Sequence, residues 1–158
     1  MGLISFENLK DFETSQFAYK KLKNFIPKLE KQSFYELRYA LTYFHQERYT
    51  KSSKLLKKYI LSKNNEYVLS AYYHLGLINF YKKKWDTAIS YWFEYLKLEK
   101  NPNKIVQAKF MIANAYESNE KLKKAYNIYY SILGSYPNPK VIKSRLNSLY
   151  KRRVARKR

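Results

Sequence analysis

The sequence predicts an all-α protein, a right-handed solenoid of about three helical hairpins, and three observations support this prediction. The chain of 158 residues contains only 3 Gly and 4 Pro, too few for a β protein, which needs turn residues every ~8–12 positions. Hydrophobic residues make up 46% of the chain, which is ordinary for a packed domain. Small residues also recur at a fixed period, and such a period is the signature of a repeat architecture.

Two sets of small residues repeat in step along the chain. Both sets show intervals of 36 and then 37 residues. The first set is Ala40, Gly76 and Ala113, and the second is Ser52, Ala88 and Ala125. Small side chains at these positions let the two helices of a hairpin approach closely. The repeat therefore predicts one hairpin for each pair of small residues.

Bulky residues follow the second small residue of each pair at the spacing of helical turns. They stand four and seven places later and are Leu56, Tyr59, Trp92, Tyr95, Tyr129 and Ile132. Residues four apart lie on the same face of a helix, so these side chains are predicted to fill the seam of the hairpin on its next turns.

Polar stretches and helix breakers divide the hairpins at the expected places. Residues 45–48, 82–84 and 118–120 are predicted to link the two helices within each hairpin. Asn64–Asn65, Asn101–Asn103 and Pro137–Pro139 are predicted to separate successive hairpins, since Asn and Pro are frequent at helix boundaries.

This pattern resembles the tetratricopeptide-repeat (TPR) family, in which W-x2-L-G-x2-Y is followed by A-x3-F and then P. The best match runs from Leu75-Gly76 to Trp92, and the resemblance covers residues 33–137. The predicted repeats span residues 33–64, 69–102 and 106–137. The chain departs from the pattern where Asn79 replaces Tyr and Ser52 replaces Ala, and its period is two or three residues longer.

Both ends of the repeats are predicted to be caps within a single domain of residues 1–150. Residues 1–31 are expected to form a degenerate hairpin. Its second helix would place Ala18 one period of 34 before Ser52, with Leu22 and Phe25 following. Phe6 occupies the position of a small residue, and Pro27 is expected to end the second helix.

Residues 139–150 are predicted to form a C-terminal capping helix, because terminal repeats need a cover for their exposed face. The apolar stripe of this helix is Val141, Ile142, Arg145, Leu146, Leu149 and Tyr150. A basic tail, residues 151–158, follows the stripe.

Net charge is +20, and it is concentrated at the C-terminal end, where residues 140–158 include nine basic and no acidic side chains. A field of this sign favours anionic partners. The candidate contacts in the tail are Lys151, Arg152, Arg153, Arg156, Lys157 and Arg158. The alternative interpretation is a tail that only aids solubility.

Nothing in the sequence supports catalysis, a cofactor or a metal site. The chain has no Cys, and its two histidines, His45 and His74, have no acidic residue at ligand spacing. Three scattered glycines cannot form a phosphate-binding loop. With no signal peptide or membrane-spanning run expected, the predicted location is cytoplasmic.

The TPR resemblance implies a concave groove lined by the first helix of each hairpin. The positions that match the groove are Leu37, Leu41, Phe44, His45, Tyr73, Leu77, Phe80, Tyr81, Phe110, Asn114, Glu117 and Ser118. This surface is apolar and aromatic over two hairpins and polar over the third.

The expected function is a non-enzymatic scaffold or adaptor that holds a helix or an extended segment of a protein partner in this groove. Acidic partners are included in this expectation. Two alternatives stay open. The C-terminal helix and tail could instead bind nucleic acid or an anionic membrane surface. The groove could also be covered by the N-terminal segment of the chain or by a second copy, as self-association would produce.

Overall fold

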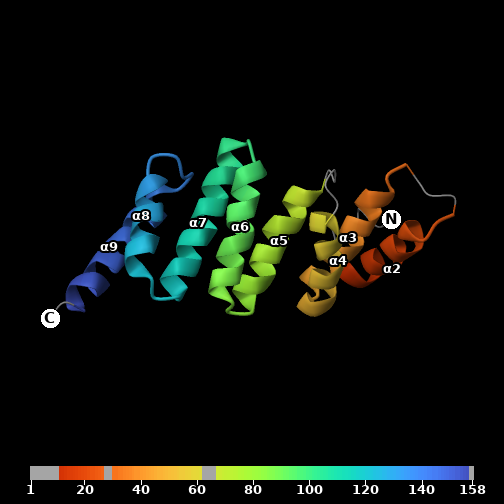
Figure 1. The fold of residues 1–158 in the computed structure, drawn as a ribbon, viewed down its shortest axis with the longest axis horizontal. Helices are drawn as coiled ribbons and strands as arrows, with labels where there is room; N and C mark the ends of the chain where they lie inside the picture. Colours follow the sequence, from red (N-terminus) through yellow and green to blue (C-terminus); the bar gives the residue numbers. More distant parts are fainter. Residues whose placement is uncertain (1–10, 27–29, 62–66, 157–158) are drawn as a thin grey trace. The chain divides into compact units, whose positions relative to one another are not determined.

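The computed structural model describes residues 11–26, 30–61 and 67–156, and over these ranges the chain is all α-helical (Figure 1). The described helices are α2 (Phe12–Lys23), α3 (Gln32–His45), α4 (Tyr49–Leu61), α5 (Val68–Tyr81), α6 (Trp85–Leu98), α7 (Pro102–Ser118), α8 (Leu122–Ser131) and α9 (Pro139–Ala155). The expected all-α repeat fold is therefore confirmed. The chain divides inside α5 into two compact units, one ending at Ile78 and the other beginning at Asn79.

In the first unit, α3 packs against α2 on one side and against α4 on the other. The seam between α3 and α4 is formed by Ala40 and Ser52, both completely buried. The Ser52 hydroxyl donates a hydrogen bond of 2.9 Å to the Ala40 carbonyl oxygen. This bond explains why Ser can replace the Ala of the repeat pattern, since a buried hydroxyl without a partner would be costly.

In the second unit, helices α6, α7, α8 and α9 pack one against the next. Ala113 and Ala125 are completely buried at the seam between α7 and α8, and Tyr129 and Ile132 fill the following turns. Trp92 is also fully buried. The positions predicted from the repeat are therefore core positions, and helix approach at small residues explains the pattern.

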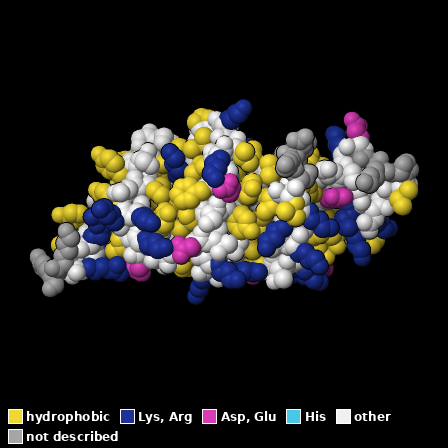
Figure 2. Space-filling view, viewed as in Figure 1, with side chains coloured by type: hydrophobic (Ala, Val, Ile, Leu, Met, Phe, Trp, Pro, Cys, Tyr) yellow, Lys and Arg dark blue, Asp and Glu magenta, His cyan; other side chains and the backbone are white. Residues whose placement is uncertain are grey.

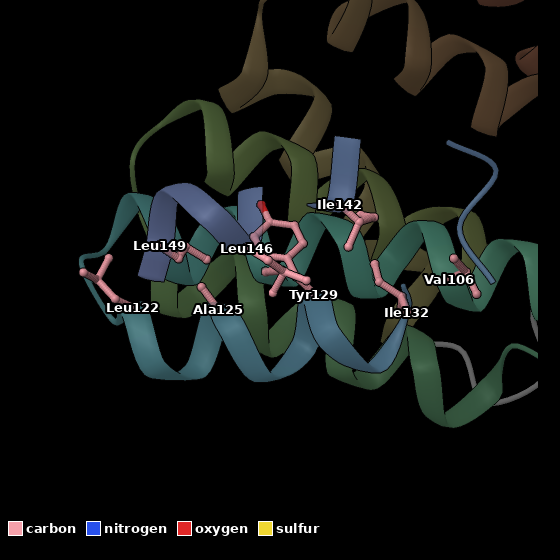
Figure 3. Packing of buried hydrophobic residues seen from close by; sticks show 9 residues of the cluster. Val106, Leu122, Ala125, Tyr129, Ile132, Ile142, Leu146 and Leu149 are labelled. Carbon is pink, nitrogen blue, oxygen red and sulfur yellow. The ribbon is translucent and has the colours of Figure 1, made fainter. Parts of the chain in front are cut away.

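Helix α9 closes the second unit, as predicted for a capping helix. Ile142, Leu146 and Leu149 of α9 join a buried cluster with residues of α7 and α8 (Figure 3). Val141 and Tyr150 of the predicted stripe are exposed instead. The helix also continues to Ala155 rather than ending at residue 150, so the first part of the predicted tail is helical.

The turns within the three hairpins have the same backbone geometry. Glu47, Lys83 and Glu120 have φ values of 59°, 57° and 55°, in the left-handed region. The residue after each of them donates its N–H to the carbonyl five residues earlier, as in the bond from Lys84 to Asn79. This is the Schellman arrangement that ends many helices, and it recurs at the 36- and 37-residue intervals of the repeat.

The boundaries between hairpins also have a local cause. The side chain of Asn101 accepts hydrogen bonds from the N–H groups of Asn103 and Lys104, with Pro102 at the first turn of α7. Asn138 caps α9 in the same way, followed by Pro139. Both residue types are favoured at these positions. The predicted break at Asn64–Asn65 lies outside the described residues.

Helix α2 is shifted by three residues from the predicted register. Ser15 and Tyr19 are the buried residues of α2, whereas Ala18 is partly exposed and Phe25 is 52% exposed. Ser15 therefore occupies the small position, 37 residues before Ser52, and the interval of 34 was wrong. Phe6 and Pro27 lie outside the described residues.

Replacing Lys83 by Gly should stabilise the second unit by about 1 kcal/mol, because a left-handed backbone conformation penalises every residue that has a Cβ. Thermal unfolding followed by circular dichroism measures the change. Ser90→Gly, at an exposed position inside α6, is the control and should lower stability by about 1 kcal/mol. A destabilising effect of Lys83→Gly would contradict the turn geometry.

The corrected register of α2 can be tested with a matched pair of substitutions. Ser15→Leu should destabilise the first unit by about 1–3 kcal/mol, because a larger side chain cannot fit at a fully buried seam without shifting its neighbours. Ala18→Leu should change stability by less than about 0.5 kcal/mol. Urea unfolding midpoints distinguish the two registers, since the order of the effects would reverse if Ala18 occupied the seam.

Candidate functional site: the faces of the first helices

A hollow of about 440 Å³ lies in the second unit on the side where α7 and α9 meet the end of α5. Its walls are formed by Phe80, Asn114, Glu117, Ser118, Glu120, Arg145 and Arg152. Four of these residues, Phe80, Asn114, Glu117 and Ser118, are positions that the sequence predicted for a groove. The structure brings them together with two arginines of α9 that the groove prediction did not include.

Glu117 is the centre of an ion-pair network in this hollow. Its side chain is only 12% exposed and lies 3.1 Å from the guanidinium of Arg152 and 3.6 Å from that of Arg145. Arg152 also pairs with Glu120 at 2.6 Å, and Arg156 contacts the same carboxylate. Two carboxylates at the end of α7 therefore pair with Arg145 and Arg152 of α9 and with Arg156, which caps that helix.

The phenol of Tyr129 reaches the hollow from the core. Its hydroxyl lies 2.5 Å from the amide oxygen of Asn114 and 3.1 Å from a carboxylate oxygen of Glu117. Burial raises the pKa of the Tyr129 phenol well above its ordinary value, and the negative charge of Glu117 adds to this rise. Tyr129 is thus a hydrogen-bond donor that fixes two groove side chains.

Aromatic rings support the apolar part of the hollow. Phe80 packs edge-on against Trp85 at 5.0 Å between ring centroids, and it also contacts the buried Trp92. Phe110, another predicted groove position, stacks on Tyr136 at 4.7 Å. Tyr81 is 54% exposed. The ring of Phe80 therefore packs on buried aromatic residues, while more than half of Tyr81 is open to solvent.

The first unit places its predicted groove residues differently. Leu37 and Leu41 are 6% and 7% exposed and belong to the core, so they offer no open surface. Phe44, Tyr73 and Leu77 are half-buried. These three residues therefore remain the candidate contact positions of this unit.

Histidines pack among the aromatic rings of the first unit. Phe44 contacts His74 at 5.3 Å between centroids, and the His74 Nδ1 donates to the Ser70 carbonyl oxygen over 2.8 Å. Burial lowers the pKa of His74. His45 stacks on Phe12 of α2 at 4.8 Å. Both histidine rings therefore pack against neighbouring aromatic side chains.

The predicted basic tail divides between helix and turn. Lys151, Arg152 and Arg153 lie within α9, Arg156 caps its end, and Lys157 and Arg158 lie outside the described residues. The role of Arg152 beside Glu117 was missed because the two residues are 35 positions apart. One feature of the sequence indicates this pairing. No acidic residue follows Glu120, so the arginines of α9 can pair only with carboxylates earlier in the chain, of which Glu117 and Glu120 are the last two.

Within the part of the chain that the structure describes, no group of three or more His, Asp or Glu residues could hold a metal ion. None of the described helices is long and apolar enough to cross a membrane. The hollow instead presents an aromatic floor, an amide, a hydroxyl and arginine donors. Such groups can hold a peptide segment through apolar contact and hydrogen bonds.

The repeated hairpins and their common turns define a helical-repeat fold. Residues 107–139 match the family model described as tetratricopeptide repeat. No curated protein matches the chain in sequence.

Solved structures give the same fold. The chain is similar to the nearly identical TPR-like repeats of a candidate kinesin light chain from Podosopora anserina, with a TM-score of 0.73 and 10% identity over 96% of this chain and 83% of that one. A single-substitution variant of those repeats matches with a TM-score of 0.71, at the same identity and coverage. The chain therefore has the TPR fold, and residues 107–139 are a tetratricopeptide repeat.

Replacing Glu117 by Gln should destabilise the second unit by about 1–3 kcal/mol, because half-buried arginines would lose their counter-charge. Chemical unfolding measures the change. Glu94→Gln is the control, because Glu94 pairs with Lys97 on the surface of α6, and such a pair contributes little. Equal effects of the two substitutions would show that the network is not a structural element.

Proposed function

We propose that this chain is a non-enzymatic scaffold or adaptor that binds a protein partner on the exposed faces of its first helices. TPR repeats generally mediate contacts between proteins, and the chain has this fold. The observation that supports the proposal most directly is the hollow of the second unit. Its side chains come from the groove positions of α5 and α7 and from the equivalent face of α9.

The partner is proposed to be a helix or an extended segment with both apolar and acidic side chains. Phe80 supplies an apolar floor, and Tyr81 exposes 54% of its surface. Arg145 is about half exposed although it contacts Glu117, so part of its guanidinium can meet a carboxylate of the partner. An amphipathic segment satisfies both requirements.

The first unit is proposed to contribute a second, more apolar contact through Phe44, Tyr73 and Leu77, which are half-buried. Burying such side chains against a partner is favourable at about 25 cal/mol per Å² of apolar surface. The absence of Cys is compatible with a reducing compartment, and we propose that the scaffold acts in the cytoplasm.

Affinity capture with the full chain, followed by titration of the captured protein, tests the groove of the second unit. Tyr81→Glu and Ser118→Arg should each weaken partner binding at least about tenfold, since a hot-spot contact contributes on the order of 1–2 kcal/mol or more. Phe93→Glu and Ser131→Arg introduce the same residues at exposed positions of α6 and α8. These controls should bind as the wild type does.

The first unit is tested with a second matched pair. Leu77→Glu should weaken the same partner, whereas Leu61→Glu, at a position 83% exposed, should not. Melting curves confirm that each variant is folded, and light scattering shows whether the captured partner is a second copy of the chain. Unchanged binding by all three groove variants would refute the proposed binding surface.

A further inference from the structure

Acidic side chains end at Glu120, although the chain continues for another two helices. Residues 121–158 contain twelve of the 32 basic side chains and none of the 12 acidic ones. In the described part of this segment, the basic residues lie on α8, on α9 and at their ends. Lys and Arg side chains are visible over the face shown in Figure 2, where Asp and Glu are few.

The basic residues of α9 face two different environments. Arg145, Arg152 and Arg156 turn toward α7, where Glu117 and Glu120 neutralise them. Lys140, Lys143 and Lys151 are exposed on another face of the helix. Within the described residues, no carboxylate forms an ion pair with these three lysines. The positive field of α9 is therefore strongest away from the groove.

The three lysines line a shallow hollow along α9. Ser144, Asn147 and Ser148 complete its lining together with Arg152. Residues 140, 143, 147 and 151 follow helical spacing, so they share one face. This face offers ammonium groups and small hydrogen-bonding side chains along the three turns of one helix, which is a suitable arrangement for successive phosphates.

Two tyrosines of α8, the half-buried Tyr126 and the exposed Tyr130, approach α9 at Arg153. Tyr126 and Tyr130 have parallel rings, 6.3 Å apart between centroids and 9° from coplanar. The guanidinium of Arg153 lies over the Tyr126 ring at 5.4 Å. Tyr130 is 65% exposed and Tyr150 is 62% exposed. Tyr150 follows Lys143 by seven positions, which places both on the same side of α9.

We propose that this surface, formed by α8 and α9, binds single-stranded nucleic acid. The lysines contact the phosphates, and Tyr130 and Tyr150 stack on bases, with Arg153 and Tyr126 extending the aromatic platform. Exposed aromatic rings beside a row of cations are the usual elements of sequence-independent single-strand binding. The three lysines and the two tyrosines are not groove residues, although Arg152 lines both hollows.

Two other anionic partners fit the surface less well. A membrane-binding helix needs large apolar side chains to insert. In the described part of α9, the exposed aliphatic residues are Val141 and Val154, and they are only 37% and 38% exposed. An acidic protein would use the lysines without any need for exposed tyrosines such as Tyr130 and Tyr150. The exposed tyrosine rings favour a partner that has planar bases as well as phosphates, because bases can stack on the rings.

Fluorescence anisotropy with a labelled single strand of about twelve nucleotides, as RNA and as DNA, tests the proposal on the full chain. Binding should weaken as salt rises from about 50 to 200 mM. Replacing Lys140, Lys143 and Lys151 by Gln together should weaken binding by about tenfold or more and lower the salt dependence by about two counterions. Replacing Lys54, Lys57 and Lys58 of α4 by Gln removes the same charge and should have a smaller effect.

Tyrosine variants separate stacking from charge. Tyr130→Ser and Tyr150→Ser should each weaken single-strand binding by about tenfold, whereas Phe17→Ser, at an equally exposed aromatic position of α2, should not. A duplex of the same sequence should bind more weakly, because its bases are not free to stack. Comparing the affinity for the RNA strand with that for the DNA strand shows whether the sugar contributes to binding.

Three results would overturn the proposal. The first is no binding at about 50 mM salt. The second is equal loss from the α4 and α9 lysine variants, which would indicate a response to net charge alone. The third is binding to phosphatidylserine vesicles or to a polyglutamate peptide as strong as to the single strand, with no effect of the tyrosine changes, which would assign the surface to a membrane or to an acidic protein.

Discussion

The close approach of two helices at a pair of small residues is the constraint on which the other features of each hairpin depend. Ala113 and Ala125 are completely buried at such a seam, as are Ala40 and Ser52. Because the backbones are close there, the next turn must be filled by a bulky residue, and Tyr129 is fully buried in that position. The hydroxyl of Tyr129 then reaches Asn114 and Glu117. Core packing thus places two side chains of the candidate site, so the site is a consequence of the seam.

The sequence was sufficient to predict the hairpins because their determinants are local. Small residues, Pro and Asn keep their positions from one repeat to the next, and each acts within a few residues of its own position. The register of α2 was not predictable in the same way. Ser15 and Ala18 are both small and lie three residues apart on neighbouring parts of one helix face, so the sequence pattern alone does not show which of the two is buried. The burial of Leu37 and Leu41 has a similar origin, because it depends on the neighbours of α3 and not on its own pattern.

The network around Glu117 shows a second limit of sequence-based prediction. The groove positions could be assigned from the repeat, since they share one helix face. Their partners could not, because Arg152 is 35 residues from Glu117 and comes from a helix whose role was predicted only as a cap. The charge pattern contained a partial signal. When a segment has no acidic residues, its arginines must pair with carboxylates outside that segment or remain in solvent.

Helix α9 shows both outcomes: some of its basic residues are paired with carboxylates, and others remain in solvent. On the α7 side, Glu117 and Glu120 neutralise the arginines, so charge there serves packing and orientation more than attraction over distance. On the other side, Lys140, Lys143 and Lys151 keep their field in solvent, where it acts over about one Debye length. A partner in the groove is therefore selected by shape, by apolar contact and by short-range contacts, such as a carboxylate on the exposed part of Arg145. A partner of the outer face is selected first by negative charge and then by what it can stack on Tyr130 and Tyr150. Apart from Arg152, which lines both hollows, different side chains carry the two selections, so the lysines and tyrosines of the outer face can be altered without changing the groove.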